Sequence, residues 1–256
     1  MDTVSAAAIR EHLHTAVFGR EMIVEKHLDS TNTRAKALAA AGAPEGTAVI
    51  ADTQSAGRGR RGRTFYSPVG GVYLSVILRP TSPVDAGLIT SCAAVAAARA
   101  IRKLCPLDVR IKWVNDLLIG GKKVCGILAE SGMTPDGAVD AIVLGIGINV
   151  AATPLPEELK STVTSLEAEG FPVDRNRLIA ALLEEWETAY ATVETGDFLA
   201  ESRRLSAVLG NHVTVVRGET AFSAFAEEIT DRGHLVVRTA AGERMTLSSG
   251  EVSIRL

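Results

Sequence analysis

The seven residues from Gly57 to Arg63 carry the side chains best suited to bind an anion. Their sequence, Gly-Arg-Gly-Arg-Arg-Gly-Arg, places four guanidinium groups among three glycines. Arginine offers a planar, permanently charged fork of donors to phosphate or carboxylate. Glycine permits positive φ and lets backbone N–H groups approach a ligand closely. The run therefore predicts an anion-binding loop, whose ligand is either a nucleic-acid backbone or the phosphates and carboxylate of small molecules.

A second polar segment, residues 112–116, has the composition to act with this loop. It consists of Lys-Trp-Val-Asn-Asp and ends in an amide and a carboxylate. Such groups at a strand end can bind Mg²⁺ or orient a nucleophile. Lys123 begins a mostly apolar strand. Most lysines are simply exposed, but Asp116 and Lys123 bracket a short hairpin, so we expect the two side chains to face each other.

A third segment, Gly145 to Asn149, alternates glycine with isoleucine. It lacks the third glycine and the following helix of the dinucleotide-binding fingerprint. Alternating glycines in a buried strand let a flat ring lie against the backbone, and Asn149 could hydrogen-bond the edge of that ring. A strand that merely ends at an asparagine is the plainer alternative.

The overall composition limits the class of protein. The chain has 256 residues, of which 46% are apolar, and a net charge of −3. Nucleic-acid-binding domains usually carry a basic excess, so the arginines indicate a local site. Three widely spaced cysteines, Cys92, Cys105 and Cys125, favour a reducing compartment over a disulfide framework. Because the sequence shows neither a secretory leader nor an apolar run of about 18 residues, we expect a cytoplasmic protein without membrane contact.

These polar segments need strands and helices to bring them together. Apolar runs predict strands at 22–25, 47–51, 72–78, 109–113, 123–130 and 138–150, with 109–113 and 123–130 paired around the turn at 120–121. Capping and helix-forming residues predict helices at 3–18, 34–41, 82–104 (capped by Ser82), 174–194 and 198–209. Short strands at 213–216, 221–229, 235–238 and 252–254 are typical of a small all-β barrel. We therefore divide the chain into domains 1–208 and 209–256.

The polar segments together resemble the motifs of one family, the biotin protein ligases, also called biotin–[acetyl-CoA-carboxylase] ligases. The matching segments follow the family's order and spacing over about residues 22–150; they are 29–32 (Asp-Ser-Thr-Asn), 54–63, 67–68, 112–116, 123–126 and 145–149. The tail at 250–255 resembles the family's C-terminal barrel. The resemblance implies an α+β fold with a mixed sheet flanked by helices, related to class II aminoacyl-tRNA synthetases, plus a small SH3-like β-barrel.

The resemblance also implies a reaction in two steps. Biotin and MgATP form biotinyl-5′-AMP and pyrophosphate, and a lysine of a biotin carboxyl carrier protein domain then attacks the mixed anhydride and releases AMP. Because the biotin carboxylate and the α-phosphate are both anionic, positive charge must offset their repulsion. Arg58, Arg60 and Lys123 match the family's residues for this task, and Arg63 is expected at the pyrophosphate end.

Further positions acquire roles through the same resemblance. Seven positions match residues that form the family's biotin pocket, some of which hydrogen-bond the ureido ring of biotin. They are Ser30, Thr31, Asn32, Gln54, Gly57, Gly59 and Gly126. Phe65 stands where the family often has tryptophan and would cover the adenine, and Asn149 would bind the edge of that base. Asp116 matches a position that binds Mg²⁺ or takes the proton of the incoming lysine, and the sequence does not separate these two roles.

Some features depart from the family pattern or test it. Val114 replaces the usual proline, and Cys125 is interpreted as a buried filler. About twenty residues precede Met22, too few for the helix-turn-helix domain of relatives that repress biotin genes. We therefore expect a monofunctional ligase, monomeric or homodimeric, that does not bind DNA. The alternatives are a lipoate- or octanoate-transferring enzyme on the same fold, and a nucleic-acid-binding module.

Overall fold

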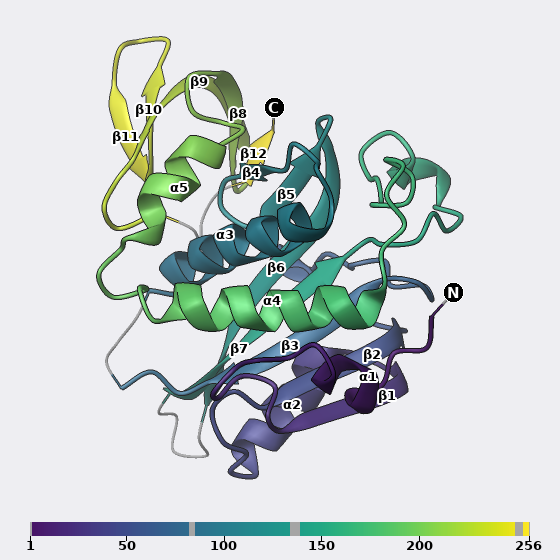
Figure 1. The fold of residues 1–256 in the computed structure, drawn as a ribbon. Helices are drawn as coiled ribbons and strands as arrows, with labels where there is room; N and C mark the ends of the chain where they lie inside the picture. Colours follow the sequence, from purple (N-terminus) through teal and green to yellow (C-terminus); the bar gives the residue numbers. More distant parts are fainter. Residues whose placement is uncertain (1, 82–84, 134–138, 249–252, 256) are drawn as a thin grey trace.

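The computed structural model describes residues 2–81, 85–133, 139–248 and 253–255, which form two β-sheets with helices (Figure 1). Within the larger sheet only β1 and β2 run parallel, and every other neighbouring pair is antiparallel. In spatial order its seven strands are β1 (Met22–Leu28), β2 (Ala48–Gln54), β3 (Val72–Leu78), β7 (Val139–Ile148), β6 (Lys122–Met133), β5 (Asp116–Ile119) and β4 (Arg110–Lys112). The predicted mixed sheet is confirmed.

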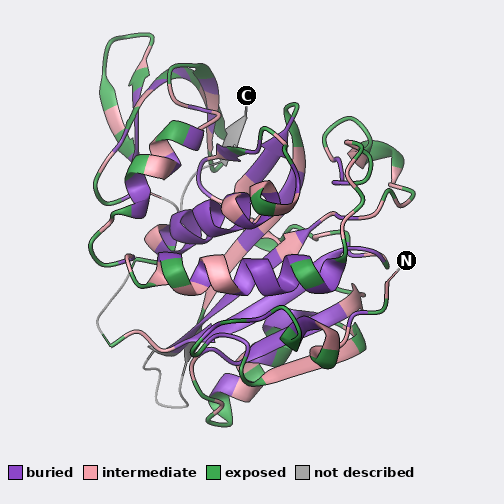
Figure 2. Ribbon diagram, in the orientation of Figure 1, coloured by how far each residue is buried: buried purple, intermediate pink, exposed green. Residues whose placement is uncertain are grey.

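Helices cover the two faces of this sheet unequally. The long helices α3 (Ala86–Leu104) and α4 (Arg175–Tyr190) pack against each other and cover one face, and α3 is buried along most of its length (Figure 2). The shorter α2 (Thr31–Ala40) packs on the other face through Ala35 and Ala39. None of the helices that the structure describes is long and apolar enough to cross a membrane.

The alternation of side chains along the central strands fixes what each face presents. On β3, Leu74, Val76 and Leu78 join the main core beneath α3 and α4, whereas Ile77 packs in the smaller cluster with α2. On β7, Leu144 and Ile146 face the main core and Val143 the smaller cluster. The residues of β3 and β7 that alternate with this main core therefore point to the α2 face. Near the beginning of α2 the helix does not cover them.

The C-terminal region forms a separate antiparallel sheet. Its spatial order is β11 (Arg244–Leu247), β10 (Leu235–Thr239), β9 (Thr220–Ile229), β8 (His212–Arg217) and β12 (Ser253–Arg255). This is consistent with the predicted SH3-like barrel. Sequence reasoning missed β11, because three of its four residues are at least partly exposed and give no apolar run. The boundary at 208/209 stays a prediction; it lies between α5 (Phe198–Leu205) and β8.

One predicted strand pairing is wrong. Residues 109–113 do not pair with 123–130, because β5 lies between β4 and β6 and is bonded to both. Sequence reasoning missed β5 (Asp116–Ile119), because its four residues form only a short run beside the Gly-Gly turn. The chain therefore folds back twice here, and Asp116 becomes the first residue of a strand next to β6.

Several helix boundaries also differ from the predicted ones. The helix predicted over 3–18 is confined to α1 (Ala6–Arg10), and α2 begins at Thr31, three residues earlier than predicted, with Ser30 as its N-cap. The predicted cap of α3 at Ser82 lies outside the described residues, and the carboxylate of Asp85 accepts a hydrogen bond from the backbone N–H of Gly87. The helix predicted over 174–194 is α4, and the one over 198–209 is α5, which ends at Leu205.

A turn of the C-terminal sheet contacts the segment that leads into β5. The indole Nε1 of Trp113 donates to the carbonyl of Gly233 at 2.9 Å, and Trp113 is buried. The segment between α5 and β8, which leads into that sheet, makes a backbone contact nearby, from Ala207 N–H to the Ile111 carbonyl at 2.8 Å. The turn thereby fixes the backbone just before Asn115 and Asp116.

We predict that Trp113→Phe destabilises the protein more than Trp186→Phe, by about 1–3 kcal/mol in the free energy of unfolding, because it leaves the buried Gly233 carbonyl without its donor. Trp186 is the matched control, since among the described residues its buried Nε1 has no hydrogen-bond partner and the same change removes a similar volume. Urea denaturation measures both. Equal losses would show that ring volume, and not the hydrogen bond, dominates.

Candidate active site

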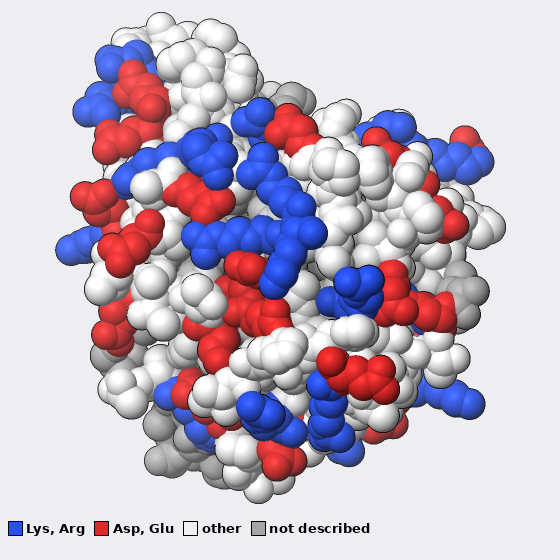
Figure 3. Space-filling view, viewed as in Figure 1, with Lys and Arg blue, Asp and Glu red and all other residues white. Residues whose placement is uncertain are grey.

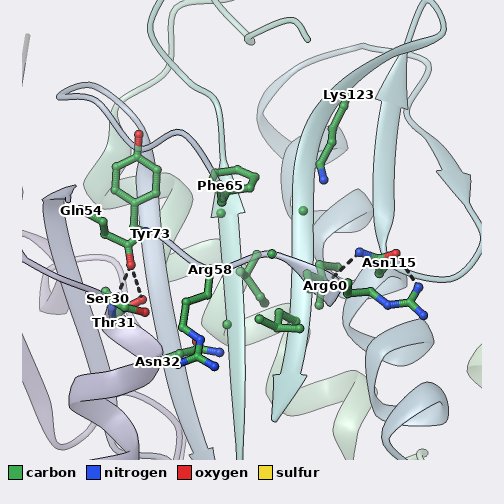
Figure 4. A pocket seen from close by; sticks show the side chains of 17 residues that line it. Ser30, Thr31, Asn32, Gln54, Arg58, Arg60, Phe65, Tyr73, Asn115 and Lys123 are labelled. Carbon is green, nitrogen blue, oxygen red and sulfur yellow. Dashed lines mark hydrogen bonds between the residues drawn. The ribbon is translucent and has the colours of Figure 1, made fainter. Parts of the chain in front are cut away.

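A polar cavity lies on the α2 face of the large sheet, at the beginning of α2 (Figure 4). Its walls come from the start of α2, the end of β2, the beginning of β3, the Arg/Gly loop, and the glycine-containing stretches of β6 and β7. The cavity brings together ten of the residues selected from the sequence: Ser30, Thr31, Asn32, Gln54, Arg58, Gly59, Arg60, Phe65, Lys123 and Gly126.

One end of the cavity is a closed hydrogen-bond network between α2 and β2. Gln54 Oε1 accepts from the backbone N–H of Thr31 at 2.8 Å and from its hydroxyl at 3.1 Å. The other end of the amide, Gln54 Nε2, donates to Ser67 Oγ at 2.9 Å. Because each polar group already has a partner, these side chains are held in place before a ligand arrives.

Ser75, which the sequence analysis did not select, completes this network. It is fully buried in the middle of β3, and its hydroxyl lies 2.6 Å from Asn32 Oδ1 and 2.8 Å from Thr31 Oγ1. Asn32 Nδ2 donates to Glu130 at 2.8 Å, so both ends of the Asn32 amide are bonded. A Cβ at Gly145 would collide with Asn32 Oδ1, which explains why only glycine fits there.

The Arg/Gly loop forms a small hairpin. Gly59 N–H donates to Arg63 O at 2.7 Å, and Phe65 N–H donates to Gly57 O at 2.8 Å. Positive φ occurs at Gly62 (74°) and also at a residue other than glycine, Arg61 (59°). Gly57 serves a different purpose, since a Cβ there would collide with the Phe65 carbonyl. The loop thus uses glycine for close approach at one end and for a left-handed turn at the other.

Each of the three cations that line the cavity is bonded to another side chain of the protein. Lys123 Nζ lies 2.7 Å from Asp116 Oδ1, which confirms that these two side chains face each other. Arg60 Nη1 donates to Asn115 Oδ1 at 3.0 Å (Figure 4), and Arg58 pairs with Glu130 on the far side of the cavity. Arg58 and Arg60 therefore point to opposite sides, a separation that their spacing of two residues did not reveal.

Burial lowers the pKa of the Arg60 guanidinium, and the neighbouring charges of Arg61 and Arg63 act in the same direction. Only Asp116 opposes them, and Arg60 remains charged because arginine does not lose its proton in proteins. A half-buried cation crowded by like charges is an energetically favourable place to bind an anion.

The aromatic ring of Phe65 occupies the surface above the glycines. A Cβ on Gly147 would lie 2.6 Å from Phe65 Cε1, and one on Gly126 would lie 2.9 Å from Cε2. Lys123 Nζ stands 5.6 Å from the centre of the same ring. The alternating glycines leave room for a flat ring, and in this structure that ring is the side chain of Phe65.

The remaining selected residues lie outside this cavity. Asp116 and Arg63 line an adjoining groove of about 560 Å³, which Lys123 and Arg60 share with the cavity. Asn149 lines a neighbouring cavity of about 280 Å³ and donates through Nδ2 to Thr164 O at 3.1 Å. Gly57 does not line the cavity, and its carbonyl accepts the hydrogen bond from Phe65 N–H that closes the hairpin.

Asp116 is the carboxylate of the groove that could bind a divalent cation. No group of three His, Cys, Asp or Glu residues close enough to bind a metal occurs among the residues that the structure describes. Mg²⁺ is commonly bound by one or two carboxylates together with substrate phosphates and waters, so Asp116, which faces the groove, fits the ion only as part of such a shared site.

Tyr73, Ser75 and Glu130 are the functional candidates that sequence reasoning missed. Tyr73 lines both cavities, and burial raises the pKa of its hydroxyl, which donates to Pro68 O at 2.7 Å. The signal for the first two was present: Tyr73 and Ser75 are polar residues two apart in a buried strand, and so share a face. Glu130 likewise shares a face with Gly126.

All three cysteines are buried and free of disulfides. Burial raises the pKa of Cys92 to about 12 and raises the pKa of the Cys125 thiol as well. Cys125 packs in the main core, in keeping with its interpretation as a filler.

The charge distribution does not favour the nucleic-acid alternative. Arg58 and Arg60 are turned to partners at the cavity and do not form a row of free phosphate-binding side chains. On the face of Figure 3, Lys and Arg gather over α3 and α5, but acidic side chains adjoin them, as in the pair Arg99–Glu201 at 2.6 Å. The arrangement favours a site for a small anionic ligand.

Comparison with known proteins bears on both regions of the chain. Residues 24–149 match the biotin/lipoate A/B protein ligase family, and residues 208–255 match the biotin protein ligase C-terminal domain. A bifunctional ligase/repressor BirA of Bacillus subtilis is 39% identical over 96% of this chain and 78% of its own length. A biotin–[acetyl-CoA-carboxylase] ligase of Mycobacterium tuberculosis is 34% identical over 96% of this chain and 93% of its own length.

The structural comparison agrees. The biotin protein ligase of Aquifex aeolicus in complex with biotin and ATP superimposes with a TM-score of 0.82 at 28% identity, covering 92% of this chain and 99% of the other. The fold expected from the sequence is thereby confirmed. Both regions are matched, and these two relatives exceed 30% identity over more than two thirds of their own length, so the chain belongs to the biotin protein ligase family.

Proposed function

We propose that this protein activates biotin with ATP as biotinyl-5′-AMP and transfers the biotin to a lysine of a biotin carboxyl carrier protein. The observation that carries the proposal is the position of Arg60 and Lys123. Both line the polar cavity and the open groove beside it, so they stand where a ligand in one meets a ligand in the other. Joining a carboxylate to a phosphate requires positive charge at such a junction.

Biotin would occupy the polar cavity with its ureido ring against α2 and β2. Ser30, Thr31 and Gln54 present short polar groups there, and Thr31 and Gln54 are already fixed by mutual hydrogen bonds. A buried urea needs such donors and acceptors, because an unpaired polar group in a closed site is costly. Asn32 contributes through the same network, with its amide oriented by Ser75 and Glu130.

The carboxylate of biotin and the α-phosphate of ATP would meet at Lys123 and Arg60. Their present partners, Asp116 and Asn115, keep the two cations in position, and the incoming anions would take over part of that role. Arg63, in the groove, would face the pyrophosphate. Phe65 would cover the adenine, and Asn149, which lines the neighbouring cavity, would bind its edge.

Asp116 has two compatible roles in the groove. Together with the phosphates of ATP it would hold Mg²⁺, which would neutralise charge on the pyrophosphate as that group departs. In the second step its carboxylate, 2.7 Å from Lys123 Nζ, would accept the proton of the carrier lysine. The open groove leaves room for that lysine to approach the adenylate.

The partners and location follow from the same chemistry. We infer a cytoplasmic enzyme, which the three buried free cysteines support. It would work as a monomer or homodimer on its carrier protein. We expect no sequence-specific binding to DNA, in keeping with the net charge of −3.

Exchange of labelled pyrophosphate into ATP tests this function directly. We expect exchange that requires both biotin and Mg²⁺ and that stops when the metal is chelated, because the adenylate forms reversibly from MgATP. Lipoate and octanoate serve as competing substrates in the same assay. Exchange with lipoate but not with biotin would refute the proposal in favour of the lipoate-ligase alternative.

Lys123→Ala should lower the rate of adenylate formation by about 100-fold or more, because it removes a charge that stabilises the transition state. Single-turnover formation of biotinyl-AMP measures this rate. Lys103→Ala is the matched control, since it also removes a lysine paired with a carboxylate, Glu184, but on the α3 face. A near wild-type rate in Lys123→Ala would show that Lys123 is not the compensating charge.

Arg60→Gly should let biotinyl-AMP escape about tenfold faster, because the phosphate loses a charged hydrogen-bond donor. Arg61→Gly is the control: Arg61 is exposed and its φ of 59° suits glycine, so this change should leave adenylate retention intact. Release of preformed adenylate, followed by filtration, distinguishes them. Equal release from both variants and the wild type would remove Arg60 from the proposed role.

A further inference from the structure

Glu130 lies on β6 and joins three elements that surround the cavity. Its Oε1 accepts from Arg58 Nη2 at 2.8 Å and from Lys36 Nζ at 3.0 Å, and its Oε2 accepts from Asn32 Nδ2 at 2.8 Å. Arg58 belongs to the Arg/Gly loop, whereas Lys36 and Asn32 belong to α2. Glu130 is largely buried and is not among the residues that line the cavity.

We infer that Glu130 is a positioning residue: its carboxylate holds the Arg/Gly loop against the sheet and orients the Asn32 amide, so that retention of biotin depends on a group that does not touch it. The inference rests on the proposed function in so far as biotin is the ligand. The link between loop, helix and strand exists without a ligand and can be tested without one.

The loop depends on this contact because few others hold it. Of its four guanidinium groups, Arg58 bonds to Glu130 and Arg60 to Asn115, while Arg61 and Arg63 are exposed. Arg58 is itself 48% exposed, so its anchor is the buried carboxylate and not packing. Without that acceptor, the positive charges of Arg58 and Lys36 would face each other with nothing between them.

The orientation of Asn32 depends on the same carboxylate. An ionised carboxylate only accepts hydrogen bonds, so Asn32 must turn its NH₂ to Glu130 and its oxygen to Ser75. Burial acts to raise the pKa of Glu130, but hydrogen bonds from Asn32 and Lys36 and the charges of Lys36 and Arg58 outweigh it and lower that pKa. Glu130 is therefore ionised at neutral pH.

The test is Glu130→Gln, which keeps the size of the side chain but presents an NH₂ donor to groups that are themselves donors. Glu184→Gln is the matched control, because Glu184 is a carboxylate of similar exposure (21% against 15%) that also bonds partners from other elements, His14 and Lys103, away from the cavity. Trypsin cleaves after arginine, and the loop contains four of them. The rate of its cleavage therefore measures how often the loop detaches from the sheet.

In the ligand-free enzyme we expect cleavage between residues 58 and 63 to be about tenfold faster in Glu130→Gln than in the wild type, and unchanged in Glu184→Gln. Biotin should dissociate about tenfold faster from Glu130→Gln. The single-turnover rate of adenylation at saturating biotin should change less than about twofold, because Arg60 and Lys123 keep their own partners, Asn115 and Asp116. A merely structural defect would instead lower the adenylation rate together with binding.

Unchanged loop cleavage and biotin dissociation in folded Glu130→Gln would overturn the inference. If that variant does not fold, Arg58→Gln breaks only the loop contact and decides the question by its cleavage after Arg60, Arg61 and Arg63: faster cleavage supports the anchor, and wild-type cleavage refutes it. A wild-type protein that fails to bind biotin would refute the proposed function, while the ligand-free cleavage would still decide the role of Glu130.

Discussion

A β-sheet alternates its side chains between two faces, and in this protein the two faces have opposite requirements. One face must bury apolar side chains under α3 and α4, which Leu74, Val76, Leu144 and Ile146 do. The other must stay open beyond the short helix α2, so that polar groups and a ligand can reach the backbone. Tyr73, Ser75, Gly145 and Gly147 alternate with those core residues, so their positions in the sequence place them on the α2 face. A shift of one residue in register would exchange the core and the site.

The electrostatics of the site follow from this geometry. Three cations converge on a partly buried region, and each is held by a partner in β5, in β6 or in the turn before β5: Asp116 for Lys123, Glu130 for Arg58 and Asn115 for Arg60. Resident partners lower the cost of keeping positive charge in a desolvated place. Asp116 and Asn115 also fix the directions of Lys123 and Arg60, so these two charges need little reorganisation when an anionic substrate enters.

The C-terminal sheet is linked to this arrangement and is not a detached module. The turn at Gly233 accepts the indole N–H of Trp113, two residues before Asn115. The segment that supplies partners to Arg60 and Lys123 is thereby held from both sides, by β6 and by the C-terminal sheet. A domain whose described residues do not line the cavity can in this way contribute to the precision of the site.

The sequence by itself indicated the family and the small β domain, because motifs and hydrophobic patterns are local properties. Through the family resemblance it also implied the mixed sheet and most of the residues around the cavity. It also indicated the pairing of Asp116 with Lys123, which lie on one hairpin. Only the tertiary structure decided that β5 separates β4 from β6, that Arg58 and Arg60 face opposite ways, and that Ser75 and Glu130 belong to the site. These depend on which strands become neighbours and on contacts between residues up to 98 positions apart, as in Asn32 and Glu130. Nothing in the local pattern of either residue specifies the other, because the carboxylate and the amide meet only after the sheet has formed.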